Sequence, residues 1–217
     1  MKKFVALPLI LLFFGATAAL AQMETASPMW VFGANVGYGL PMGDFKDGYT
    51  WKMADDREFT LGYDGALSAG VSGCYMFTDK YGVELAVDWN KFPVNDVSKD
   101  TLTSRMMDVE TDANFQFIPV TVDFLANFPV AAPIVPYVKG GLGIYFWKHE
   151  TDPETTIAID KLKNQSGNDF GFNLGVGIKY PVAETTILDV GARFHNIMTE
   201  DTSIQYFTFT AGVGFMF

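Results

Sequence analysis

The chain has 217 residues, of which 49% are hydrophobic, 15% aromatic and 18% charged. This composition is too apolar for a disordered chain. The formal net charge of -10 argues against a nucleic acid or an anionic lipid surface as a partner, because both attract basic proteins. A single cysteine excludes an intramolecular disulfide framework. The mean hydropathy of +0.15 points instead to a membrane, so spanning segments must be sought.

Residues 1–21 have the pattern of an export signal. Two lysines open the segment, an apolar run follows at 4–14, and Ala19 and Ala21 place small residues where a signal peptidase requires them. A membrane-spanning helix needs about 20 apolar residues, so this run is too short for an anchor. We therefore predict a signal peptide at 1–21 and one mature domain at 22–217.

The predicted mature domain has no run suited to a spanning helix. Its longest apolar stretch, 128–138, is interrupted by three prolines. Without spanning helices, a chain can cross a membrane only as a closed barrel, because every backbone polar group must be bonded within the protein. Apolar residues do alternate with small or polar ones, which is the period of a strand. This alternation predicts eight strands, at 30–42, 63–77, 81–90, 114–128, 136–147, 169–180, 187–196 and 206–217.

The connections between these strands alternate in length. Short ones are expected at 78–80, 129–135 and 181–186, and longer ones at 43–62, 91–113, 148–168 and 197–205. This alternation is typical of outer-membrane barrels, so the predicted fold is an all-β, eight-stranded antiparallel up-and-down transmembrane barrel. The longer connections hold most of the 25 acidic residues, and we expect them to face the outside of the cell. An even number of strands then places both mature termini in the periplasm.

Two features favour a membrane barrel over a soluble one. The less apolar face is rich in glycine, for example at Gly33, Gly141 and Gly212, which weakens an exposed strand but suits a crowded interior. Aromatic residues on the apolar face gather near the strand ends, with aliphatic residues between them. The expected rings are Trp30, Phe77, Tyr81, Phe128, Tyr180 and Phe217 at one level, and Tyr38, Trp89, Phe146, Phe170, Phe194 and Phe207 at the other.

The last strand, 206–217, carries the most specific motif. Phe209 and Phe215 alternate toward a terminal Phe217, and this pattern resembles the assembly signal of the small outer-membrane barrels of the OmpA, OmpX and OmpW type. Residues 136–145 and 41–45 are similar to that family's fifth strand and first strand exit. The resemblance implies the barrel assembly machinery as a partner during biogenesis, and outer-membrane lipid and lipopolysaccharide as surroundings. The resemblance does not extend to the periplasmic domain of OmpA, so tethering to the cell wall is not expected.

Ionisable residues on the inward face form a predicted lumen polar network. Its members are Asp64, Glu84, Asp88, Asp123, Lys139, Asp169, Lys179, Asp189, Arg193 and His195. Charges in a narrow interior are costly unless paired, so we expect acids and bases to crosslink the lumen. The alternative is a cation-selective path. We favour the structural interpretation, because eight strands enclose an interior that side chains can fill.

Neither histidine of the sequence stands in a pattern that predicts catalysis or metal binding. The segment around His195 resembles lipid A deacylases of the PagL type, but their serine two positions later is here Ile197, and nothing fixes Ser203 against the histidine. His149 lies among acids, but the spacing predicts no closed set of ligands. We therefore expect no catalytic residue, metal or cofactor.

The resulting hypothesis is a monomeric, non-enzymatic outer-membrane barrel that supports the envelope or binds a partner through its longer loops. A narrow, porin-like channel for small or amphipathic solutes, as in the OmpW resemblance, is the alternative. A lipid A-modifying enzyme is a remote one.

Overall fold

The computed structural model describes residues 29–52, 58–96, 98, 112–152, 165–199 and 203–217. The predicted signal peptide lies outside these residues, as do parts of the longer connections. The signal peptide and the domain boundary after Ala21 therefore stay predictions. No helix within the described ranges is long and apolar enough to cross a membrane.

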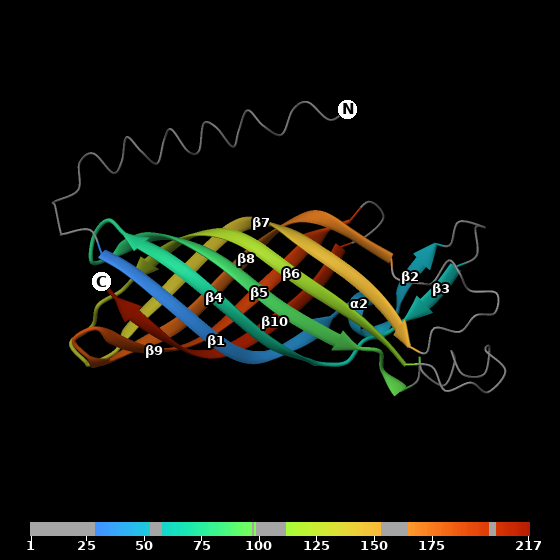
Figure 1. Ribbon diagram of the computed structural model, residues 1–217, viewed down its shortest axis with the longest axis horizontal. Helices are drawn as coiled ribbons and strands as arrows, with labels where there is room; N and C mark the ends of the chain where they lie inside the picture. The colour runs from blue at the N-terminus through green and yellow to red at the C-terminus, as the bar shows by residue number, and fades with distance from the viewer. Residues whose placement is uncertain (1–28, 53–57, 97, 99–111, 153–164, 200–202) are drawn as a thin grey trace, which may run out of the picture.

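In the described residues, eight strands close into one antiparallel barrel, as the alternation predicts (Figure 1). The strands are β1 (Met29–Met42), β4 (Ala66–Met76), β5 (Tyr81–Pro93), β6 (Asp112–Asn127), β7 (Val135–Asp152), β8 (Gln165–Ala183), β9 (Thr186–Met198) and β10 (Ser203–Met216). Each pairs with its neighbours along the chain, and β1 pairs with β10 to close the barrel. The predicted fold class is confirmed.

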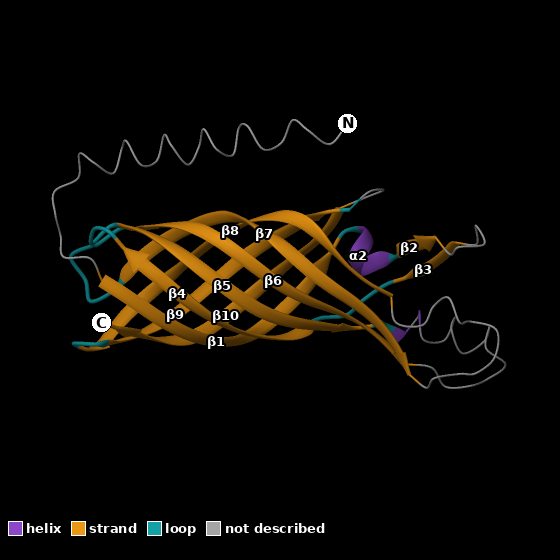
Figure 2. Ribbon diagram, turned by 45° about the horizontal axis from the view of Figure 1, so that its top comes forward, coloured by secondary structure: helices purple, strands orange, loops and turns teal. Residues whose placement is uncertain are grey.

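The barrel has two different ends, which we name by their connections. The turn end carries the short connections, drawn in teal at the C-terminal end of the barrel in Figure 2. The loop end carries the longer ones, together with a short helix, α2 (Asp44–Asp47), and a hairpin of β2 (Tyr49–Lys52) and β3 (Glu58–Leu61). The helix and hairpin occupy the predicted connection 43–62, which therefore has regular structure of its own.

Several strands extend further than predicted at the loop end. β7 runs to Asp152 and β8 begins at Gln165, although 148–168 was expected to be a loop. The extra residues of the two strands pair with each other, Lys148 with Ser166 and His149 with Gln165. A ladder of backbone hydrogen bonds therefore extends these strands. β4 begins later than predicted, at Ala66, because Tyr63 pairs with Val94 in an isolated bridge.

The outer wall is apolar and aromatic. In β1, exposed and partly buried residues alternate, and Trp30, Val36 and Tyr38 are 48%, 66% and 47% exposed. Rings near both levels of the wall are exposed, including Phe128, Phe146, Phe170 and Tyr180. Such an outer surface is favourable only against lipid, which agrees with the sorting of rings by height along the strands.

Candidate functional site: the lumen of the barrel

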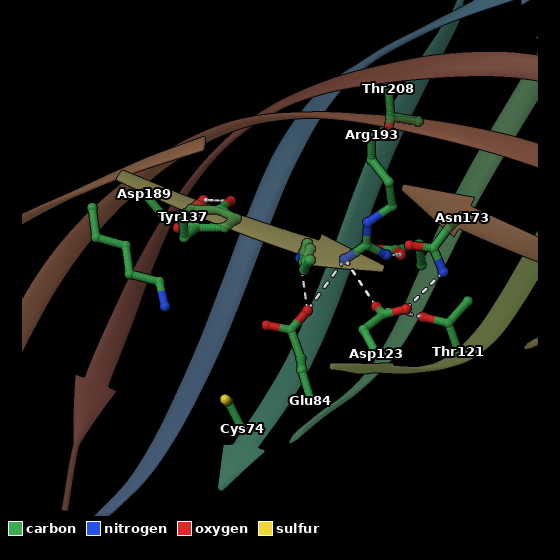
Figure 3. A network of polar contacts seen from close by, with 12 residues as sticks. Cys74, Glu84, Thr121, Asp123, Tyr137, Asn173, Asp189, Arg193 and Thr208 are labelled. Carbon is green, nitrogen blue, oxygen red and sulfur yellow. Dashed lines mark hydrogen bonds and ion pairs between the residues drawn. The ribbon is translucent and has the colours of Figure 1, made fainter. Parts of the chain in front are cut away.

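Arg193, on β9, is the centre of a buried ion-pair network (Figure 3). Its guanidinium nitrogens lie 3.2 Å from Glu84, 3.1 Å from Asp88 and 3.5 Å from Asp123. Lys139, on β7, reaches the same Glu84 oxygen at 2.7 Å. Three acids and two bases from four strands are thereby tied across the lumen. A guanidinium suits this position because its planar donors can serve several carboxylates at once.

Neutral side chains complete the bonding of the most deeply buried acid. Asp123 is 0% exposed, and it accepts hydrogen bonds from Asn173 at 2.7 Å and from Thr121 at 3.2 Å. A Cβ at Gly141 would collide with the carboxylate of Asp123, so the glycine makes room for it. A buried carboxylate is tolerated only with such partners. This arrangement agrees with the crosslinking expected for a filled lumen.

A second polar group lies toward the turn end. The Tyr137 hydroxyl donates to Asp189 at 3.0 Å, and the Lys179 ammonium lies 5.0 Å from the centre of the Tyr137 ring and 3.3 Å from the Asn127 side-chain oxygen. Cβ atoms at two glycines, Gly177 and Gly191, would collide with the Tyr137 hydroxyl. Glycine in the wall therefore provides the space that a large inward side chain needs.

His195 is held in a different layer, between the Arg193 network and the loop end. Its Nδ1 lies 3.0 Å from the Tyr145 hydroxyl and its Nε2 3.3 Å from the Thr208 hydroxyl. The ring also stacks on Tyr206, with centroids 4.5 Å apart. Ser203 pairs in register with Met198, near the loop end, so it is not a partner of this histidine.

The remaining two predicted members, Asp169 and Asp64, also lie apart from the Arg193 network. Asp169 accepts a hydrogen bond from the Trp147 indole at 2.8 Å, nearer the loop end. The expectation for Asp64 is wrong, since its side chain is exposed. It lies before β4 begins, and its backbone N–H bonds to Pro93 at the end of β5. Alternation continues only along a regular strand, so the prediction failed where β4 had not yet started.

A cluster of buried apolar residues, which the alternation does not predict, fills the loop half of the barrel. Phe45, on α2, enters the barrel mouth and packs against Tyr63 and Phe92, with ring centroids 4.8 and 5.2 Å away. We call this set the aromatic cluster, and its members are Phe45, Leu61, Tyr63, Ala66, Phe92, Val94, Ala113, Phe115, Phe117, Tyr145, Ile197, Ile204 and Tyr206. Each of them is 0–2% exposed, so this part of the lumen is packed like a protein core.

The turn half of the lumen contains a cavity of about 70 Å³. Arg193, Glu84 and Asp189 line it, together with Cys74. The volume suffices for a few water molecules, and the polar walls offer them partners. A smaller apolar group, formed by Cys74, Met76, Leu125 and Tyr137, borders the cavity toward the turn end. The described lumen is thus an ionic layer with apolar groups on both sides.

The site considered for a metal lies at the loop end of β7. His149 is 3% exposed, and its ring lies 6.1 Å from that of Phe115. Beside it, Glu150 is bonded by Lys148, and this hydrogen bond lowers the pKa of the Glu150 carboxyl. The described residues contain no group of three or more His, Cys, Asp or Glu side chains that could hold a metal ion.

An apolar belt around a closed antiparallel barrel, with glycine and paired charges inside, defines the class of small transmembrane β-barrels. The chain matches the outer membrane protein beta-barrel domain over residues 7–217, so it belongs to that family and to the outer membrane. The resemblance inferred from the last strand is confirmed. No curated protein matches the chain significantly.

Solved structures of outer-membrane proteins share the fold. A major outer membrane protein from Thermus thermophilus superposes with a TM-score of 0.56 at 14% identity, covering 88% of this chain and 100% of that one. OprG from Pseudomonas aeruginosa superposes with a TM-score of 0.54 at 16% identity, covering 90% of this chain and 98% of that one. Neisserial surface protein A superposes with a TM-score of 0.53 at 15% identity, covering 88% of this chain and 99% of that one. Identities this low indicate a common fold and leave the role to be argued from the site.

Proposed function

We propose that the protein is a non-enzymatic outer-membrane barrel with a closed lumen, whose role is envelope support or the binding of an external partner at the loop end. The observation that carries this proposal is the filling of the lumen. The Arg193 network crosslinks its middle, and the aromatic cluster packs its loop half. Both make the wall rigid, and a rigid wall is a suitable scaffold for displaying loops.

The orientation that goes with this role places the loop end outside the cell and both mature termini in the periplasm. The longer connections would then meet lipopolysaccharide, and their acidic residues could be bridged to its phosphates by divalent cations. Phe209, Phe215 and Phe217, which are 49%, 47% and 77% exposed, would present the assembly signal on the outer wall. The signal peptide would direct export, and the folded protein would act as a monomer.

Deletions in the longer connections test the loop role. We expect removal of residues within 99–111 or 153–164 to change envelope permeability or surface binding, while the barrel still folds. Folding is checked by the heat-dependent mobility shift on detergent gels. If every loop deletion left permeability and surface binding unchanged, a role carried by the loops would be excluded.

The absence of catalysis is supported by the engagement of His195. Both ring nitrogens face hydroxyls of Tyr145 and Thr208, and the ring is 1% exposed inside the lumen. Incubation of the folded barrel with lipid A should release no acyl chains. Release that is lost in His195→Ala would contradict the proposal and support a lipid A-modifying enzyme.

A narrow channel is the second candidate, and the polar cavity of about 70 Å³ is the observation in its favour. Recordings in planar bilayers separate the two. We expect no steady single-channel steps from the wild-type protein. Steps that change in Glu84→Gln, but not in the exposed control Glu184→Gln, would establish a lumenal current and overturn the closed lumen.

A further inference from the structure

The connection between β6 and β7 is an apolar turn at the turn end of the barrel. Residues 128–134 read Phe-Pro-Val-Ala-Ala-Pro-Ile, without any charged or hydrogen-bonding side chain. Residues 128–133 are all exposed, with Phe128 at 52% and Val130 at 50%. A connection that projected into water would be expected to carry turn-forming polar residues instead.

The apolar turn is held in this exposed position. The Phe128 N–H bonds to the Pro136 carbonyl at 2.8 Å and closes the base of the turn. Pro129 and Pro133 each fix one backbone dihedral, which restricts the ways in which the segment could fold back on itself. Covering its apolar surface from outside the barrel would remove that surface from water, which is favourable.

The turn is continuous with the lipid-facing belt. Phe128 extends the exposed apolar face of β6, which includes Phe124, and the next exposed residue on β7 is Val138. The end of β8 adjoins the turn, since Val135 pairs with Lys179, and Tyr180 and Val182 are exposed there. One unbroken apolar surface thus runs from the wall onto the turn.

The neighbouring connection between β4 and β5 is a matched contrast. It reads Phe77-Thr78-Asp79-Lys80. The Phe77 ring lies against the wall, 6.4 Å from that of Phe124, and the charged side chains of Asp79 and Lys80 are exposed. The two connections adjoin, because the Asn127 N–H bonds to the Lys80 carbonyl at 2.6 Å. The tips of two turns at the same end of one barrel, in contact with each other, thus differ in polarity.

We propose that the apolar turn 128–134 is a lipid contact, inserted at the boundary between headgroups and acyl chains of the leaflet at the turn end. The occupant is lipid because the surface continues the belt that the bilayer already covers. Pro129 and Pro133 keep the segment rigid enough to enter without further ordering. The charged connection 78–80 stays in water, so the barrel rests on its leaflet through one sector of its rim.

Spin labels on the folded protein in phosphatidylcholine vesicles test this assignment. In a Cys74→Ser background, labels are attached at Val130→Cys, at Ala132→Cys and, as the matched control, at Asp79→Cys. Oxygen partitions into lipid and a nickel chelate into water, so the ratio of their accessibilities reports depth. We expect this ratio to be about fivefold higher at positions 130 and 132 than at 79, as for an interfacial segment.

Each outcome decides the matter, provided that all three variants show the heat-dependent shift of a folded barrel. A high ratio at 130 and 132 supports insertion. An equal ratio at all three positions, with the nickel chelate reaching 130 as readily as 79, would overturn it. The turn would then project into water as an apolar surface, available to a soluble protein partner.

Discussion

The two halves of the lumen are built by the same strands but filled by different chemistry. Toward the loop end, the inward positions carry rings and aliphatic groups that are 0–2% exposed. Toward the turn end, the inward positions carry ion pairs, a tyrosine with two ammonium groups near its ring, and a cavity of about 70 Å³. Apolar packing tolerates small errors of position, whereas an ionic network depends on each partner. Substitutions in the two halves should therefore lower the free energy of unfolding by different amounts and for different reasons.

The largest loss is expected when the cation at the centre of the ionic half is removed. Arg193→Met leaves Glu84, Asp88 and Asp123 facing one another with Lys139 as the nearby base. Leaving buried charges without their partner should lower the free energy of unfolding by about 4 kcal/mol. Denaturant unfolding in lipid vesicles measures it.

The matched control for Arg193→Met is an ion pair in water. The side chains of Lys148 and Glu150 are 48% and 33% exposed. Lys148→Met breaks their contact and should lower the free energy of unfolding by less than about 1 kcal/mol. If both variants lost the same free energy of unfolding, burial would not be what makes the Arg193 ion pairs important for stability.

The apolar half should respond next most strongly. Phe117, in the aromatic cluster, is 0% exposed and lies between Phe115 and Tyr206, with ring centroids 4.6 and 5.6 Å away. Phe117→Ala should lower the free energy of unfolding by about 3 kcal/mol, because it leaves a cavity. Phe117→Leu should recover most of the loss, which distinguishes packing from any specific role of the ring.

Removing a neutral hydrogen-bond donor from the ionic half should lower the free energy of unfolding by a moderate amount. Asn173→Ala removes the 2.7 Å bond to the fully buried Asp123, while Arg193 and Thr121 still contact that carboxylate. We expect a loss of about 2 kcal/mol, the usual range for a bond to a charged group. An unchanged midpoint of unfolding would show that water replaces the amide.

The smallest of these effects is expected from one hydroxyl next to the cavity. Tyr137→Phe removes the 3.0 Å bond to Asp189 and should cost about 1 kcal/mol, because water in the cavity can take its place. Tyr75→Phe on the outer wall, where the ring is 37% exposed, is the control and should change the free energy of unfolding by less than about 0.5 kcal/mol.

The strands were predictable because every second residue of a strand faces outward and must be apolar. Facing direction followed from the same rule, which placed Glu84, Asp123 and Arg193 inside. Alternation says nothing about height, however, so it could not separate Asp169 from the Arg193 network. It also could not show which acid would meet which base, since those contacts depend on strand register.

The aromatic cluster escaped prediction for a related reason. Phe92 lies two residues beyond the predicted end of its strand at residue 90, where inward positions change from polar to apolar. Phe117 lies on the inward face of a strand whose rings were sought on the outside. Phe45 could not be placed, because a four-residue helix leaves little pattern in a sequence. The signal in the sequence is the change of the inward face from polar to apolar near the loop end of each strand.

The closure of the barrel has a consequence for how the chain reaches its native state. Trp30 and Phe217 exchange two backbone hydrogen bonds, at 3.1 and 2.9 Å, so the first described strand meets the last residue of the sequence. Contacts so distant along the chain form slowly, since a long loop must close before they contribute. Until β10 arrives, β1 and β9 would present two unpaired edges, which are templates for aggregation. Folding must therefore wait for the complete chain, and premature termination anywhere before β10 would leave a species that cannot close.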